Sequence, residues 1–228
     1  MRVRCAPTNG TLYADPRRTP ALQLRTIALV LLALTVLPPA AAVAQSAWTA
    51  DPQVQQRLTA GEVVVAAGTP ADPQHPRGLV QAAVRISASP EAIWKVLTDC
   101  QQALTYVPGL LGCRRIDGAP DGSWADIEHV VHYSWMLPTV RYVFHAEYQR
   151  PNRIDFHRIS GDLKEEQGTW LLTPSPDGSS TLVQYEVYID PGFWVPQFLV
   201  HRSLRKDLPA ALNGLRERVE AVDGSATR

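Results

Sequence analysis

The stretch from Val84 to Ile116 constrains the fold most strongly, because it joins a strand pattern to a helix start and two cysteines. Its first residues alternate as a β-strand does. Ser89 and Pro90 then supply an N-cap and a proline at the first helical position. A Val-Pro-Gly turn follows the helical part, and Cys100 and Cys113 flank it. The stretch therefore predicts a strand, two short helices and a second strand in direct succession.

The first 44 residues differ in character from the rest of the chain. Arginines precede an apolar run at 27–37, and a small-x-small pattern ends at Ala44. This order is typical of a secretory signal peptide. The alternative, a membrane-anchoring helix, needs about 20 apolar residues, and prolines interrupt this run sooner. We therefore expect cleavage near Ala44 and a periplasmic or secreted mature protein.

Removal of this segment changes the charge of the protein. The whole chain has 22 basic and 22 acidic side chains, whereas residues 45–228 have 17 and 21. A mildly acidic protein lacks the basic surface that neutralises phosphates. We expect no nucleic-acid partner.

The cysteines support the same compartment. Cys5 lies in the predicted signal peptide, which leaves Cys100 and Cys113 as an even pair in the mature protein. Two thiols separated by a short loop favour a disulfide in an oxidising compartment. A metal pair would need nearby histidine or cysteine ligands, and a redox pair is normally Cys-x-x-Cys. The sequence thus predicts a Cys100–Cys113 disulfide.

Turn signals divide the rest of the chain into short segments. Six strands are predicted between Leu111 and about Val195. Apolar residues at helical spacing from Leu204 to Val222 predict a long C-terminal helix, which Pro209 should kink. The remaining segments are a polar region with a short helix at 45–60, an edge strand at 61–66, a core strand at 79–87 and a disordered tail at 224–228.

These motifs resemble the START-like (SRPBCC) superfamily, in particular its polyketide cyclase/dehydrase and coenzyme Q-binding START-like branch. The markers are SPEAIWKVLTD at 89–99, VPGL at 107–110, GDLKEEQGTW at 161–170 and LRKDLPAALNGLRERVE at 204–220. The resemblance implies an α+β helix-grip (START-like/Bet v 1-like) domain over 61–223, with an antiparallel sheet wrapped around the C-terminal helix. It also implies an apolar cavity rather than one shared reaction.

Alternation along the predicted strands separates an inner face from an outer face. Between 125 and 137 the odd positions are mostly apolar, and His129 shares their face. In the next strand Tyr142 and Phe144 point the same way, and the strand after it adds Arg158. An aromatic face with a few polar groups suits a ligand pocket, but it also suits a plain core.

His129 and Arg158 require partners, because an unpaired polar group on an apolar face is costly. His129 could be a hydrogen-bonded core residue, a ligand contact or a proton-transfer group. Arg158 could form a structural ion pair or bind a ligand's carboxylate, phosphate or carbonyl. His132 falls on the opposite face from His129, so the two do not form a metal pair. We find no catalytic motif and predict no catalytic residue, metal or cofactor.

The sequence favours an exported, non-catalytic carrier of a hydrophobic small molecule such as a lipid, quinone or polyketide-like compound. One alternative is a cyclase- or dehydratase-like enzyme in which His129 or Tyr185 moves a proton. Another is an envelope interaction protein with a vestigial cavity. The aromatic segment 191–198 would then contact a partner or a membrane surface. The predicted ligand-binding residues are His129, Tyr133, Tyr142, Phe144, Arg158, Trp170 and Tyr185.

Overall fold

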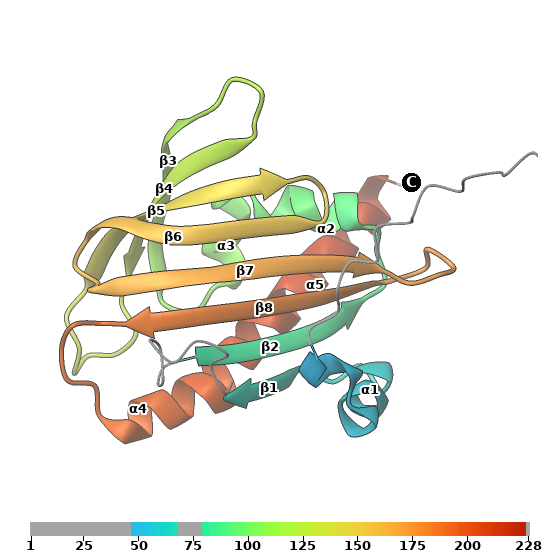
Figure 1. The fold of residues 1–228 in the computed structure, drawn as a ribbon, viewed down its shortest axis with the longest axis horizontal. Coiled ribbons are helices and arrows are strands. Elements are labelled where there is room, and N and C mark those ends of the chain that lie inside the picture. The colour runs from blue at the N-terminus through green and yellow to red at the C-terminus, as the bar shows by residue number, and fades with distance from the viewer. Residues whose placement is uncertain (1–46, 68–78, 227–228) are drawn as a thin grey trace, which may run out of the picture. The chain divides into compact units, whose positions relative to one another are not determined.

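One antiparallel sheet of eight strands organises the computed structural model, which describes residues 47–67 and 79–226 (Figure 1). Its order is β1-β2-β8-β7-β6-β5-β4-β3, so the last strand returns beside β2 and the predicted six-strand meander is present. The predicted signal peptide, residues 1–44, lies outside the described residues. The strands are β1 Val64–Ala67, β2 Leu79–Ile86, β3 Leu110–Gly118, β4 Trp124–Val131, β5 Val140–Gln149, β6 Arg153–Gly161, β7 Glu165–Pro174 and β8 Thr181–Asp190.

Three helices, α2, α3 and the long α5, lie on one face of the sheet (Figure 1). In the described part of the chain, no helix is both long enough and apolar enough to cross a membrane. The helices are α1 Pro52–Thr59, α2 Pro90–Leu97, α3 Cys100–Tyr106, α4 Gln197–Arg202 and α5 Leu208–Ala226, with a 3-10 turn at Ala47–Ala50 and a π-helical turn at Ser203–Asp207.

The predicted helix start is confirmed in its details. The Ser89 hydroxyl accepts a hydrogen bond from the backbone N–H of Ala92 at 3.2 Å, and Pro90 begins α2. Asp99 caps α3 in the same way, accepting from the N–H of Gln101 at 2.7 Å. These caps satisfy backbone donors that a helix leaves unpaired at its first turn.

The predicted disulfide joins the start of α3 to β3. The Cα atoms of Cys100 and Cys113 are 5.1 Å apart, which is within the usual range for a disulfide. The bond therefore ties the two short helices to the first strand of the meander.

The core lies where α2 and α5 cover the inner face of the sheet. Ile93 of α2 and Leu215 of α5 are fully buried against Val84 of β2 and Leu172 of β7. Burying each such side chain contributes about 1.5–3 kcal/mol. Helix α1 covers part of the opposite face, where Leu58 contacts the β1–β2 region.

The strand predicted over 125–137 is shorter than expected. β4 ends at Val131, and Trp135 is 87% exposed in the loop that follows. The His132 N–H donates to the Gly109 carbonyl at 2.8 Å, one residue beyond the last β3–β4 pair. A side chain at Gly109 (φ +77°) would approach the His132 carbonyl oxygen to 2.7 Å, so this contact requires glycine. The alternation after Val131 thus does not indicate strand.

The C-terminal helix differs from the prediction at both ends. α5 extends through Ala226, so residues 224–226 of the predicted disordered tail are helical. Pro209 has no N–H to donate and its ring interferes with the preceding turn. The irregularity expected there takes the form of the π-helical turn at Ser203–Asp207.

Candidate functional site

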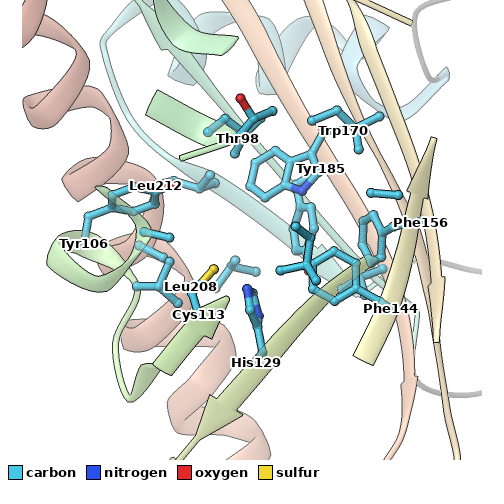
Figure 2. A pocket seen from close by; sticks show the side chains of 18 of the residues that line it. Thr98, Tyr106, Cys113, His129, Phe144, Phe156, Trp170, Tyr185, Leu208 and Leu212 are labelled. Atoms are coloured by element: carbon cyan, nitrogen blue, oxygen red, sulfur yellow. The ribbon is translucent and has the colours of Figure 1, made fainter. Parts of the chain in front are cut away.

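A cavity of about 280 Å³ lies between the sheet and the helices. Figure 2 shows aromatic side chains from the sheet on one side and Tyr106, Leu208 and Leu212 from the helices on the other. His129 reaches the same space from β4. The cavity is therefore where the helix-grip arrangement brings α3 and α5 over strands β4 to β8.

The sheet side of the cavity is a continuous aromatic wall. Trp170 of β7 pairs with Tyr185 of β8 in the strand register, and their ring centroids are 4.2 Å apart. Phe156 of β6 stacks on Tyr185 at 6.2 Å and meets Phe144 of β5 edge-on at 5.9 Å. Alternate residues of neighbouring strands share a face, which is why these rings meet.

Small residues leave room beside this wall. A Cβ atom at Gly168 would approach the Phe156 ring to 2.6 Å, so glycine allows the ring to lie across β7. Ala146, Ala103 and Ala211 line the cavity itself, from β5, α3 and α5. Larger side chains at these positions would fill the space.

His129 is a polar side chain that packs against the aromatic rings of this wall. Its ring meets Tyr142 and Phe144 edge-on, with centroids 5.8 and 4.9 Å away. Its Nδ1 lies 3.4 Å from the Tyr142 hydroxyl oxygen. Burial lowers the pKa of His129 to about 4, because a charged imidazolium would lose its hydration there. The imidazole is therefore uncharged at neutral pH.

Glu166 of β7 is a buried carboxyl. It is 6% exposed, and its Oε2 atom has no hydrogen-bond partner. Burial raises the pKa of Glu166 to about 7, although hydrogen bonding with Tyr142 partly offsets the effect. The same carboxyl and burial raise the pKa of Tyr142. Tyr142 and His129 thus form a polar pair in an apolar setting, and the charge of Glu166 acts on Tyr142.

Tyr133 brings a second phenol toward Glu166. It comes from the β4–β5 loop, and 49% of its surface is accessible. Its phenol group is nevertheless enclosed, so that burial and the charges of Glu166 and Asp207 raise its pKa to about 12. The phenol of Tyr185 responds in the same direction to burial and to Glu166. These hydroxyls remain protonated at physiological pH.

Residues 86–216 match the family of polyketide cyclase / dehydrase and lipid transport proteins. The chain belongs to this family. Among curated protein sequences, none matches this chain.

Solved structures of low sequence identity share the helix-grip fold. A START superfamily protein from Mycobacterium smegmatis is 21% identical, over 63% of this chain and 98% of that one, with a TM-score of 0.54. A fragment of the STAR-related lipid transfer protein from Xanthomonas axonopodis is 15% identical, over 69% and 93%, with a TM-score of 0.57. The Zhui aromatase/cyclase from Streptomyces sp. R1128 is 14% identical, over 62% and 93%, with a TM-score of 0.50.

Five of the seven predicted ligand-binding residues line the cavity of this family member. Two do not. Tyr142 does not line the cavity, but its hydroxyl oxygen lies 3.4 Å from Nδ1 of His129, which does. Arg158 is opposite Phe144, as predicted, but its Nη2 donates to the Gly161 carbonyl oxygen at 2.7 Å. The five that line the cavity are His129, Tyr133, Phe144, Trp170 and Tyr185.

Glu166 is absent from the sequence-based predictions, yet the alternation contains a signal for it. Once Trp170 is placed on the inner face, positions 168 and 166 of the same strand follow onto that face. Only the assembled structure shows that this carboxyl is buried.

Two histidines are neighbours on the outer face of the sheet. His145 and His157 are paired in the β5–β6 register, with ring centroids 5.4 Å apart. His145 Nδ1 lies 2.6 Å from Asp126 Oδ1. In the part of the chain that the structure describes, no three His, Cys, Asp or Glu residues are grouped to hold a metal ion.

Proposed function

We propose that the protein is an exported carrier that holds a hydrophobic small molecule, such as a lipid, quinone or polyketide-like compound, beneath α5. The observation that carries this proposal is the cavity of about 280 Å³ with its aromatic wall. Transfer of apolar surface from water into such a space is favourable by about 25 cal/mol per Å² before the costs of association. Few polar groups would then orient the ligand.

Two features of the polar groups support a carrier over an enzyme. A general base works best with a pKa near the operating pH, whereas the pKa of His129 is lowered to about 4. Glu166 has a suitable pKa, about 7, but it does not line the cavity. His129→Ala would separate the roles, because an enzyme would lose turnover while it still bound its ligand.

Filling the cavity tests the proposal most directly. Ala211 lines the cavity from α5, whereas its neighbour Ala210 is exposed on the same helix. We expect Ala211→Phe to weaken binding of the neutral fluorescent probe N-phenyl-1-naphthylamine at least tenfold and Ala210→Phe to leave it unchanged. Equal binding by both variants, or no binding by the parent protein, would contradict the proposal. Mass spectrometry of co-purifying apolar compounds would identify the natural ligand.

Export is proposed from two independent features. The first is the arginine-flanked apolar run that ends in a small-x-small pattern at Ala44. The second is the Cys100–Cys113 disulfide, a bond that persists in oxidising compartments. Expression of the full chain in a bacterium, followed by cell fractionation and N-terminal sequencing, should recover a periplasmic or secreted protein that begins near Gln45. Recovery of an uncleaved protein in the cytoplasm would refute the proposal.

Peripheral membrane contact is proposed at one end of the sheet. β4 and β8 run in the same direction, so the loops that follow them lie at the same end (Figure 1). Trp135 in the first loop is 87% exposed and Trp194 in the second is 81% exposed. Tryptophan favours the boundary between apolar and aqueous phases.

Vesicle sedimentation tests this contact. Replacing both Trp135 and Trp194 with serine should release the protein from vesicles of phosphatidylcholine and phosphatidylglycerol. Ile116→Ser is a matched control. Ile116 is an exposed apolar residue near the end of β3 that lies away from the two tryptophan loops. Equal sedimentation of all three proteins would rule out this surface.

A further inference from the structure

A row of polar side chains crosses the outer face of the sheet, opposite the cavity. Asp126 of β4 pairs with His145 of β5 in the strand register, and His145 pairs with His157 of β6. Successive side chains of a strand point to opposite faces, and the preceding residues Phe144 and Phe156 line the cavity. The two histidines therefore face away from the cavity, and the proposed binding of an apolar ligand does not use them.

The spacing of the two imidazole rings suits a shared metal ion. The ring centroids of His145 and His157 are 5.4 Å apart. A metal–nitrogen bond is about 2.0–2.1 Å long, so a bound ion lies about 3.2 Å from the centroid of each imidazole. At the tetrahedral angle, this arrangement places the two centroids about 5 Å apart. The rings already lie at about this separation.

The Asp126 carboxylate determines the role of each His145 nitrogen. Its Oδ1 atom lies 2.6 Å from His145 Nδ1. A carboxylate can only accept a hydrogen bond and a neutral imidazole has one N–H, so Nδ1 donates and Nε2 keeps its lone pair. Metal-binding histidines almost always donate their other ring N–H to a carboxylate, a carbonyl or water in this way. Trp124 packs beside the same ring, with centroids 5.2 Å apart, and helps to hold its orientation.

His157 supplies the second nitrogen from an exposed position. It makes no hydrogen bond with a described residue. It borders a hollow on the outer face together with Glu147, Asp155 and Glu186, and none of the described residues that line this hollow is a lysine or an arginine. Arg153 pairs with Asp155 at 2.6 Å, which leaves two acidic side chains to attract a cation.

We propose that His145 and His157 bind one late divalent transition-metal ion, with Asp126 orienting His145 and water completing the coordination. Imidazole suits Cu²⁺, Ni²⁺ and Zn²⁺, and Cu²⁺ binds such ligands most tightly. Ca²⁺ and Mg²⁺ require oxygen ligands. The site has two protein ligands, in keeping with the finding that the described residues contain no group of three. It departs from the sequence-based expectation of no metal.

Calorimetric titration of the full protein, purified without a polyhistidine tag, tests the proposal with Cu²⁺, Ni²⁺ and Zn²⁺. We expect one tightly bound ion per chain, with Cu²⁺ the tightest. His157→Asn should weaken Cu²⁺ binding by about tenfold or more, because one imidazole then acts alone. His132→Asn is the matched control and should change nothing, because His132 Nδ1 faces the Thr139 hydroxyl at 3.1 Å rather than a second histidine. Equal Cu²⁺ affinity of the parent and His157→Asn would overturn the proposal.

Pulsed electron paramagnetic resonance of the Cu²⁺ complex identifies the ligands directly. The parent protein should show two coordinated imidazole nitrogens, and His145→Asn and His157→Asn should each show one. Asp126→Asn should keep both nitrogens but weaken binding by about 10- to 100-fold, as loss of an orienting carboxylate does. An Asp126→Asn protein with the affinity of the parent would show that this carboxylate does not position His145.

The remaining outcomes would also overturn the site. If Ca²⁺ binds as tightly as Cu²⁺, the acidic hollow holds the cation and the histidines do not. If His132→Asn lowers the Cu²⁺ affinity as much as His157→Asn does, the ion lies elsewhere. If the parent protein binds none of Cu²⁺, Ni²⁺ and Zn²⁺, the histidine pair is a solvated surface feature. None of these results affects the carrier function, because the cavity lies on the other face of the sheet.

Discussion

Replacing Glu166 with glutamine should stabilise the protein at pH 8 and leave its stability unchanged below about pH 4.5. Burial raises the pKa of Glu166 from 4.5 to about 7 in the folded protein. Below pH 4.5 Glu166 is protonated in the folded and the unfolded protein, so it does not reduce the free energy of unfolding. That stability is lost as the pH rises through the folded-state pKa of about 7, because the buried carboxyl must then ionise. Each pKa unit corresponds to about 1.4 kcal/mol, so the ionised carboxyl costs about 3 kcal/mol at pH 8. Glutamine removes this cost.

His129 produces the opposite dependence and sharpens the test. Burial lowers its pKa from 6.5 to about 4, so the stability of its neutral form is present above pH 6.5 and is lost as the pH falls through 4. Between pH 4.5 and 6.5 the pH dependence of stability caused by Glu166 and that caused by His129 have opposite signs and nearly cancel in the parent protein. Glu166→Gln should therefore become more stable by about 3 kcal/mol from pH 4 to 6.5, because only the His129 effect remains.

Urea unfolding followed by tryptophan fluorescence at pH 4, 6 and 8 measures these differences. Glu165→Gln, on the other face of β7, controls for the amide substitution itself. A Glu166→Gln protein that is destabilised by the same amount at every pH would refute the reasoning. That result would mean that the carboxyl contributes structurally rather than through its ionisation.

Three further perturbations have defined outcomes. Replacing Cys100 and Cys113 with serine should lower the free energy of unfolding by about 3 kcal/mol, as expected for a loop of 13 residues. The effect should vanish when parent and variant are compared under reducing conditions. Gly214→Ala should lower the melting temperature, because the new Cβ would lie 2.8 Å from the Cβ of Tyr106. Overpacking costs about 1–3 kcal/mol and exceeds the gain in helix propensity; a higher melting temperature would contradict this. Phe156→Ala should lower the free energy of unfolding by about 3–5 kcal/mol. It should also enlarge the cavity, so that larger probes bind better in titrations. Unchanged stability would show that this ring is not part of the core.

Local signals predicted much of the fold. The cap at Ser89 and the proline after it act within one helical turn, so they require no knowledge of the rest of the chain. The alternation of Trp170 with its neighbours and of Tyr185 with its own follows from strand geometry alone. These patterns placed five of the seven predicted residues around the cavity.

Long-range contacts decided the remaining site geometry. The β5–β6 register shifts between Val143 and Phe144, which leaves Ile159 as an extra residue near the end of β6. Gly161 then comes so close to Tyr142 that a Cβ atom there would lie 2.4 Å from the Tyr142 Cα. Arg158, beside this bulge, binds the Gly161 carbonyl, which accounts for its place outside the cavity.

The sequence by itself determined the helix start at Ser89, the cysteine pair and the aromatic inner face, because caps, loop closure and strand alternation depend on residues near one another. The helix-grip class was implied by the resemblance of its motifs to the START-like superfamily. Only the tertiary structure decided that Glu166 is buried, that Tyr142 lies beside His129 and outside the cavity lining, and that the chain after Val131 leaves the sheet. Burial and pKa depend on atoms from several strands at once. For that reason the polar centre of this cavity emerges only when the strands are assembled.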